Sequence, residues 1–205
     1  MKRTRKREDL IRVGRDLIVR KGFNATGLSD VLALAQVPKG SFYYYFESKE
    51  AFGLAIIEET EKQYQQKLDN TLSNRQIPPL DRLSRYFEQG IAEMRACEQE
   101  EGCLLGNLAQ EMSAQNPAFR DRLNQIFTDW EKRLSVCLEE AHATGAIAKA
   151  PTAELSQFIL AGWQGAMLRA KVANAIEPLQ TFVNIVFRQI LIAPDPSNSK
   201  KSASG

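Results

Sequence analysis

The sequence is poor in the residues that build metal centres and disulfide-bonded scaffolds. Its 205 residues include one histidine, His142, and three cysteines, Cys97, Cys103 and Cys137. An odd cysteine count without metal-ligand spacing predicts free thiols in a reducing compartment. A single histidine with no ligand cluster around it predicts that no metal is bound, and no sequence feature calls for a cofactor.

Long apolar runs, strand-like alternation and internal repeats are also missing. No apolar span reaches the length of a membrane helix, and no signal-peptide core is present. We therefore expect a cytoplasmic protein without a membrane partner. With 43% hydrophobic and 25% charged residues, the chain has the composition of a globular protein that can bury a core.

Catalytic motifs are scarce as well. The sequence shows no Cys–His–acid spacing, no glycine-rich phosphate loop and no paired-carboxylate motif. A thiol-dependent enzyme is the alternative from another functional class, and the sequence does not support it. We therefore predict that the protein is not an enzyme.

The charge that is present is unevenly distributed. Residues 1–50 hold 11 Lys or Arg against 6 Asp or Glu, whereas the remaining residues hold 16 against 19. This basic segment indicates a nucleic-acid partner, while the formal net charge of +2 argues against a DNA binder that ignores sequence. The basic cluster Lys2–Arg7 is either an arm that reaches DNA or a solvated terminus, and both readings remain open.

The stretch Val37–Glu50, VPKGSFYYYFESKE, is the most informative part of the chain. Upstream, Leu28–Gln36 has the pattern of a short helix, with Ser29 as its start signal. Pro38 and Gly40 then interrupt the helical pattern. Two short helices joined by a tight turn form a helix-turn-helix, whose second helix can enter a DNA major groove.

The second of these helices is rich in aromatic residues. Phe42 and Phe46 are four residues apart and share a face, so we expect them to pack inward. Ser41 and the three consecutive tyrosines are left for DNA, the backbone or solvent, and hydroxyls and lysines suit phosphate oxygens. The alternative is that the tyrosines are ordinary surface and core residues, which leaves the helix-turn-helix pattern unexplained.

The run GFNATGLSDVLALAQVPKGSFYYYFESKEAF resembles the DNA-binding domain of the TetR family of bacterial transcriptional regulators. The resemblance implies a homodimeric repressor that binds a palindromic double-stranded operator and responds to an effector. Members often carry Ser or Thr where this chain has Pro38, so a hydroxyl contact is lost there. By resemblance, the operator-contacting positions are Thr26, Lys39, Gly40, Ser41, Tyr43, Tyr44, Tyr45 and Lys49.

The helical pattern continues through the chain and predicts an all-α fold. We expect three domains or segments: a three-helix helix-turn-helix domain over 1–48, a helical effector-binding and dimerisation domain over 49–193, and a disordered tail over 194–205. Ser48 is expected to cap a long linking helix that runs from Lys49 to about Asn74. Further helices are expected at 8–21, 80–94, 104–112, 118–145, 155–170 and 182–191.

The last two helices are candidates for a dimer interface. Gly162, Gly165 and Ala166 are small enough to let another helix come close, and a palindromic operator requires a two-fold dimer. A four-helix bundle between two copies is expected, as the resemblance also implies. The alternative is that these helices form only the core of the monomer.

A further resemblance concerns the stretch Glu100–Glu111, EEGCLLGNLAQE, and the AKVANAIEPL stretch near Lys171. Both are similar to a branch of the family that responds to electrophiles, oxidants or small unsaturated compounds through a cysteine at the GCL position. Cys103 lies at an expected helix start, where the helix dipole favours a thiolate. The alternatives are a structural Cys103 with a non-covalent ligand and a Lys171 that only extends to solvent.

Together with Cys103 and Lys171, we expect Trp163 and Met167 to belong to the effector site, because they share one helical stripe with Lys171. Cys97 and Cys137 are expected to be packing residues.

Overall fold

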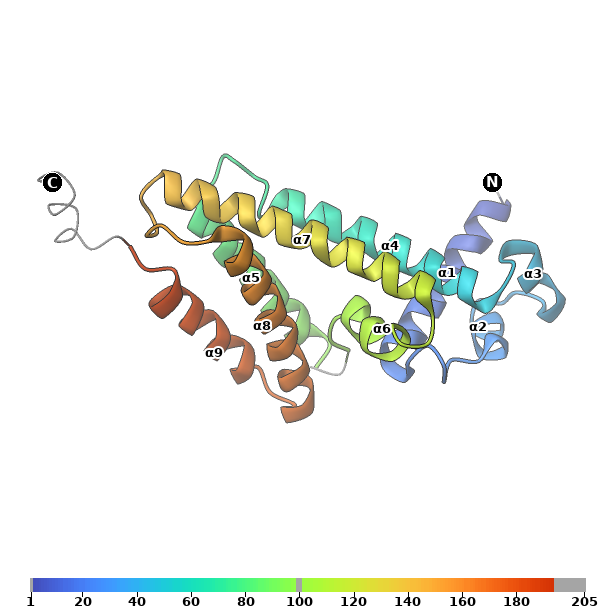
Figure 1. Cartoon of the computed structure of the whole chain (residues 1–205). Helices are drawn as coiled ribbons and strands as arrows, with labels where there is room; N and C mark the ends of the chain where they lie inside the picture. The colour runs from blue at the N-terminus through green and yellow to red at the C-terminus, as the bar shows by residue number, and fades with distance from the viewer. Residues whose placement is uncertain (1, 99–100, 194–205) are drawn as a thin grey trace, which may run out of the picture. The chain divides into compact units, whose positions relative to one another are not determined.

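A computed structural model of the chain describes residues 2–98 and 101–193. These residues are helical with no strand among them, which confirms the predicted fold class (Figure 1). A 3₁₀ turn, Lys39–Ser41, precedes α3, and a π-helical turn, Val186–Ile190, follows α9. The helices are α1 Lys2–Lys21, α2 Leu28–Leu34, α3 Phe42–Tyr45, α4 Lys49–Asn70, α5 Pro79–Ala96, α6 Leu104–Met112, α7 Pro117–Ala143, α8 Thr152–Ala173 and α9 Glu177–Ile185.

The chain divides into two compact units, which we describe separately. The first takes its described residues from 1–65 and 100–126, and the second from 66–99 and 127–205. Unit one therefore holds α6 and parts of α4 and α7 in addition to α1–α3. The domain division at residue 48 remains a prediction, and the predicted tail over 194–205 lies outside the described residues.

An aromatic core organises the first unit. The Phe42 and Phe46 rings lie 5.6 Å apart, and the Phe52 ring of α4 lies 5.5 Å and 4.9 Å from them. Phe42 and Phe46 are 1% and 5% exposed, which confirms that they pack inward. In α1, a Cβ on Gly14 would lie 2.3 Å from Cζ of Phe52. The absent side chain therefore lets α4 approach α1.

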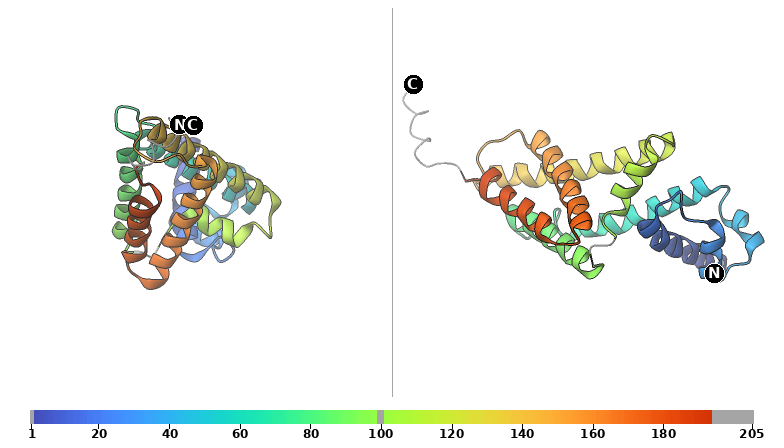
Figure 2. Two further views of the ribbon diagram at one scale, coloured as in Figure 1. Left: turned by 60° about the vertical axis from the view of Figure 1, so that its left-hand side comes forward. Right: turned by 90° about the horizontal axis from the view of Figure 1, so that it is seen from below.

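A second aromatic cluster lies in the other unit, where α8 and α9 run side by side (Figures 1 and 2). Trp163 of α8 is 3% exposed, and its ring lies 4.9 Å from that of Phe87 and 6.0 Å from that of Phe182. A Cβ on Gly162 would lie 2.5 Å from Cε2 of Phe182. The absence of a side chain at Gly162 therefore lets α9 of the same chain pack closely against α8. No atom lies within 4 Å of the Cβ position of Gly165.

Several element boundaries differ from those expected. Glycine 27, not Ser29, is the N-cap residue of α2, and Ser29 is exposed inside the first turn. Helix α1 begins at Lys2 and not at the expected residue 8, so the basic cluster Lys2–Arg7 is part of this helix. Helix α4 ends at Asn70, before the predicted Asn74, because a turn begins at Thr71.

Candidate functional site

The turn between α2 and the recognition segment, Lys39–Tyr45, depends on a residue that the sequence did not single out. Gln36 has a φ of +52°, in the left-handed region, and the Val37 N–H donates to the Leu32 carbonyl over 2.9 Å. This arrangement is a common end for a helix, usually with glycine at the left-handed position. Gly40, which the sequence indicated, lies instead in the 3₁₀ turn. A left-handed glutamine has no clear sequence signal.

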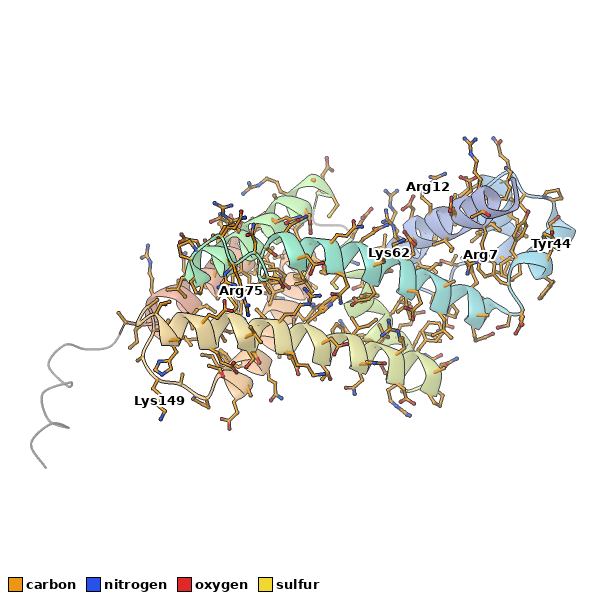
Figure 3. All side chains as sticks on the ribbon, turned by 90° about the horizontal axis from the view of Figure 1, so that it is seen from above. Arg7, Arg12, Tyr44, Lys62, Arg75 and Lys149 are labelled. Carbon is orange, nitrogen blue, oxygen red and sulfur yellow. The ribbon has the colours of Figure 1, made fainter. Side chains whose placement is uncertain are left out.

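The recognition segment exposes most of its predicted contact residues. Tyr43 and Tyr44 are 72% and 59% exposed, and Lys39 and Gly40 are exposed as well (Figure 3 labels Tyr44). Ser41 and Tyr45 are half-buried, and the Tyr45 ring packs against that of Tyr44 at 5.1 Å. Phe42 and Phe46, which are four residues apart on one helical face, pack into the core and hold the segment in place. The segment can therefore present phenolic hydroxyls and a cation to a polyanion.

Two residues assigned by resemblance are engaged within the protein. Thr26 is 2% exposed, and its hydroxyl donates to the Gly22 carbonyl over 2.7 Å. Thr26 thus braces the turn after α1 and offers no surface to a ligand. The Lys49 ammonium lies 4.9 Å from the Phe23 ring centroid and donates to the Asn24 carbonyl over 3.3 Å. A phosphate contact by Lys49 would have to compete with these interactions.

The residues that follow the recognition segment are tied to α1 and α4. The Arg7 guanidinium of α1, labelled in Figure 3, lies 5.0 Å from the centroid of the Phe46 ring. The Ser48 hydroxyl accepts a hydrogen bond from the Ala51 N–H over 3.0 Å, which confirms the predicted cap of α4. Backbone and Ser48 hydrogen bonds lower the pKa of the Glu50 carboxyl, as expected for an acid in the first turn of a helix.

Cys103 is the N-cap residue of α6 and is 5% exposed. Its Sγ accepts a hydrogen bond from the Gly106 N–H over 3.4 Å. The Tyr64 hydroxyl of α4 lies 4.0 Å from the same sulfur and donates toward it. The Gly106 N–H and the Tyr64 hydroxyl therefore both donate toward Sγ, and burial limits the access of small reagents to this thiol. Tyr64 lies 39 positions before Cys103, and nothing in the residue pattern indicated that the two side chains meet.

At the other end of α6, Glu111 makes a contact that sequence reasoning missed. Its two carboxylate oxygens accept hydrogen bonds from the backbone N–H groups of Phe23 and Asn24, over 2.7 Å and 2.8 Å. The turn is shaped by Gly22, whose φ is +86° and whose missing Cβ leaves room for the carboxylate. Charge-assisted bonds of this kind are the stronger class of hydrogen bond. Helix α6 therefore carries both Cys103 and a clamp on the α1–α2 turn.

The other three predicted effector residues belong to the second unit. Trp163 and Met167 are 3% and 8% exposed and form part of its core, and Lys171 is half-buried. Cys103 belongs to the first unit, so a joint site of Cys103 with Lys171 remains a prediction.

The remaining thiols, like Cys103, are free. Burial raises the pKa of Cys137 to about 11, and its Sγ donates to the Pro79 carbonyl over 3.2 Å. Cys97 is half-buried, and its Sγ donates to the Met94 carbonyl over 3.3 Å. Nδ1 of His142 lies 3.4 Å from the Ile147 carbonyl oxygen.

Residues 2–98 and 101–193 contain neither a metal-binding group of side chains nor a helix that could span a membrane. No group of three or more His, Cys, Asp or Glu side chains could hold a metal ion. Within the same ranges, none of the helices combines the length and the apolar character that crossing a membrane requires.

One face of α8 is apolar and uncovered. Phe158, Leu168 and Val172 are 56%, 44% and 67% exposed. Ala161 and Gly165 are also exposed and continue the same line, with spacings of three and four residues. The opposite face of α8 is packed against its own unit through Trp163. A stripe of this kind on a helix is typical of a surface that another helix covers.

Comparison with known protein families covers most of the chain. Residues 10–56 match the family described as bacterial regulatory proteins, tetR family. Residues 79–186 match the family described as tetracyclin repressor-like, C-terminal domain.

Individual relatives extend over nearly the whole length. The HTH-type transcriptional repressor DhaR of Mycobacterium sp. (strain GP1) is 37% identical over 93% of this chain and 95% of its own. The crystal structure of E. coli NemR in its reduced form has a TM-score of 0.84 at 33% identity, covering 92% of this chain and 98% of that one. The crystal structure of the regulatory protein TetR from Rhodobacter sphaeroides has a TM-score of 0.84 at 35% identity, covering 88% of this chain and 96% of that one.

Proposed function

The chain belongs to the TetR family of bacterial regulatory proteins, and from this premise we propose that it is a cytoplasmic repressor that leaves its operator when Cys103 is modified. Members of this family are DNA-binding transcription regulators and not enzymes. The observation that carries the DNA-binding surface is the exposure of Tyr43 and Tyr44 beside the buried Phe42. Lys39, Gly40 and Ser41 complete the proposed contact set, while Thr26 supports the turn from inside.

The DNA-bound form is proposed to be a homodimer. A palindromic operator presents two half-sites one helical turn apart, and a two-fold dimer matches them with one recognition segment each. The uncovered α8 stripe of Phe158, Leu168 and Val172 supports this assembly, because its side chains would otherwise remain in water. Gly165, which has no neighbour within 4 Å of its Cβ position, would let the partner helix come close.

The proposed input is a small electrophile or oxidant. Support comes from the placement of Cys103 at a helix N-terminus beside the Tyr64 hydroxyl. With an electron-poor alkene such as a maleimide, Sγ would form a bond to one alkene carbon while the C=C π bond breaks, and the neighbouring carbon would take up a proton in place of the one that the thiol releases. A crystal structure of the relative NemR is that of its reduced form, which we take as support for a redox-sensitive input in this chain. A purely non-covalent ligand with a structural Cys103 is the competing proposal.

We propose that α6 passes this event to the DNA-binding helices. Bulk added at Cys103 would displace the first turn of α6, where Sγ holds the Gly106 N–H. Glu111 at the other end of α6 would then move relative to the N–H groups of Phe23 and Asn24. Helix α4, which begins directly after the recognition segment, is the other candidate for this coupling. Either route biases the protein toward a state whose recognition segments fit the operator poorly.

The test uses DNA from upstream of the protein's own gene, and measures binding by fluorescence anisotropy with and without N-ethylmaleimide. Wild type should bind and then be released by the reagent, whereas Cys103→Ser should bind and stay bound. Cys137→Ser is the matched control and should behave like wild type, because a thiol whose pKa is about 11 is almost entirely protonated at neutral pH.

Two outcomes would separate the parts of this proposal. Release of both wild type and Cys103→Ser would refute the assignment of Cys103 as the sensor. Binding of both proteins without release would support the DNA-binding surface and favour a non-covalent effector instead.

A further inference from the structure

The second unit contains a cleft that is lined mainly by positive charge. It has a volume of about 410 Å³ and lies among residues that follow α4, the first turns of α5 and the later turns of α7. Four cationic side chains, Arg75, Arg82, Lys132 and Arg133, line it together with one carboxylate, that of Glu140. An adjoining cleft of about 490 Å³ shares Arg75, Arg82 and Glu140 (Figure 3 labels Arg75). The shared residues therefore separate two openings to solvent.

Arg82 is the fixed cation of this cleft. Its side chain is 3% exposed, Nη1 donates to the Leu72 carbonyl over 2.9 Å, and Nη2 pairs with Glu140. Nε is buried and has no hydrogen-bond partner within the described part of the chain. A buried guanidinium normally has all its donors satisfied, since an unsatisfied donor is costly. This donor remains available to an acceptor that enters the adjoining opening, whether a water or a ligand oxygen.

Two of the other cations, Arg75 and Lys132, are largely exposed and can change partner. Arg75 is 78% exposed and pairs with Glu140 at 2.9 Å, and Lys132 is 69% exposed and pairs with Asp129 at 3.0 Å. Arg133 contacts Asp69 at 2.5 Å near the cleft. Exposed pairs of this kind contribute little stability and are screened by salt. Arg75 and Lys132 can therefore turn toward a ligand at low cost.

We propose that this cleft binds a small multivalent oxyanion, such as a di- or tricarboxylate or a phosphorylated metabolite. Glu140 alone serves both Arg75 and Arg82, so the carboxylate charge within the cleft is outnumbered four to one. Guanidinium groups pair with carboxylate and phosphate through the same two-pronged geometry, and an anion with several charges engages several of them at once. The site depends neither on operator binding nor on the chemistry of Cys103.

The test measures binding to the full-length protein by isothermal titration calorimetry. Trisodium citrate and sodium pyrophosphate represent the two ligand sources, and sodium acetate and sodium chloride at equal ionic strength are the reference solutes. Wild type should bind at least one of the multivalent anions and neither reference solute. The double variant Arg75→Gln/Lys132→Gln should bind roughly tenfold more weakly, since each removed charge contributes a modest factor.

Lys149→Gln is the matched control, because Lys149 is an exposed cation of the same unit that does not line either cleft (Figure 3). It should retain wild-type affinity. Both substituted cations are largely exposed, so the double variant should keep the wild-type unfolding temperature. Binding of citrate alone identifies a carboxylate ligand, and binding of pyrophosphate alone identifies a phosphate ligand. Heats equal to those of sodium chloride, or equal affinity of the double variant and Lys149→Gln, would overturn the proposal.

Discussion

Tyr43 is the more exposed of the two exposed tyrosines in the recognition segment, at 72% against 59% for Tyr44. We expect Tyr43→Phe to reduce operator affinity by roughly 1 kcal/mol, because one hydroxyl hydrogen bond to phosphate is lost while the ring is kept. The loss should be similar on the operator and on single-base variants, as measured by fluorescence anisotropy. Tyr86→Phe in the second unit is the control and should leave affinity unchanged. A large change in base preference would show that Tyr43 reads bases.

Glu140 is a residue whose contribution should depend on pH. The hydrogen bond from Arg82 lowers the pKa of its carboxyl, so its stabilising effect is fully present above the ordinary value of 4.5 and disappears as the pH falls through the lowered value. Glu140→Gln should reduce the free energy of unfolding at pH 7 by roughly 2 kcal/mol, since Arg82 stays buried without its counter-charge. Urea denaturation at pH 7 and at acidic pH measures both effects.

The control for Glu140 removes a carboxylate from an exposed pair. Asp121→Asn breaks the contact with Arg120 at 3.0 Å, where both side chains are largely exposed. It should change the free energy of unfolding by less than about 0.5 kcal/mol at either pH. Equal effects of the two substitutions would mean that burial of Arg82 does not strengthen its pair.

At the scale of elements, helix α6 carries Cys103 as its N-cap residue and Glu111, the clamp on the α1–α2 turn, near its C-terminal end. Glu111→Gln should loosen the turn after α1, because the amide can accept only one of the two backbone hydrogen bonds and carries no charge. Hydrogen exchange of the Phe23 and Asn24 amides, followed by mass spectrometry, should become faster, and operator affinity should fall by roughly 1 kcal/mol.

Gln110→Ala is the control on the same helix, because Gln110 is exposed. It should alter neither the exchange rates nor operator affinity. Unchanged exchange in Glu111→Gln would exclude α6 as the clamp and leave α4 as the coupling element.

For the whole molecule, the uncovered stripe on α8 predicts the assembly. Leu168→Glu places a charge within the proposed interface of both copies. The dissociation constant of the dimer should therefore increase by roughly tenfold or more. Sedimentation equilibrium measures this change, and operator affinity should fall with it because a monomer contacts one half-site. Val136→Glu is the control, since Val136 is 45% exposed on α7 and lies outside the stripe. A dimeric Leu168→Glu protein would place the interface elsewhere.

The sequence by itself determined the all-helical class, the inward packing of Phe42 and Phe46 and the cap at Ser48. These features depend on periodicity and on local hydrogen bonding, which act over a few residues and can be read from spacing. The family resemblance rests on the same local run, so it was also available without coordinates.

Only the tertiary structure decided which side chains meet across long separations. The clamp of Glu111 on the α1–α2 turn joins positions 87 and 88 residues apart, and the Tyr64 hydroxyl meets Cys103 over 39 residues. It also showed that Thr26 is buried, that Gln36 has a left-handed backbone conformation and that Gly162 makes room for Phe182 of α9 in the same chain. Burial and contact depend on how the helices pack, and a residue's type and spacing leave several packings possible.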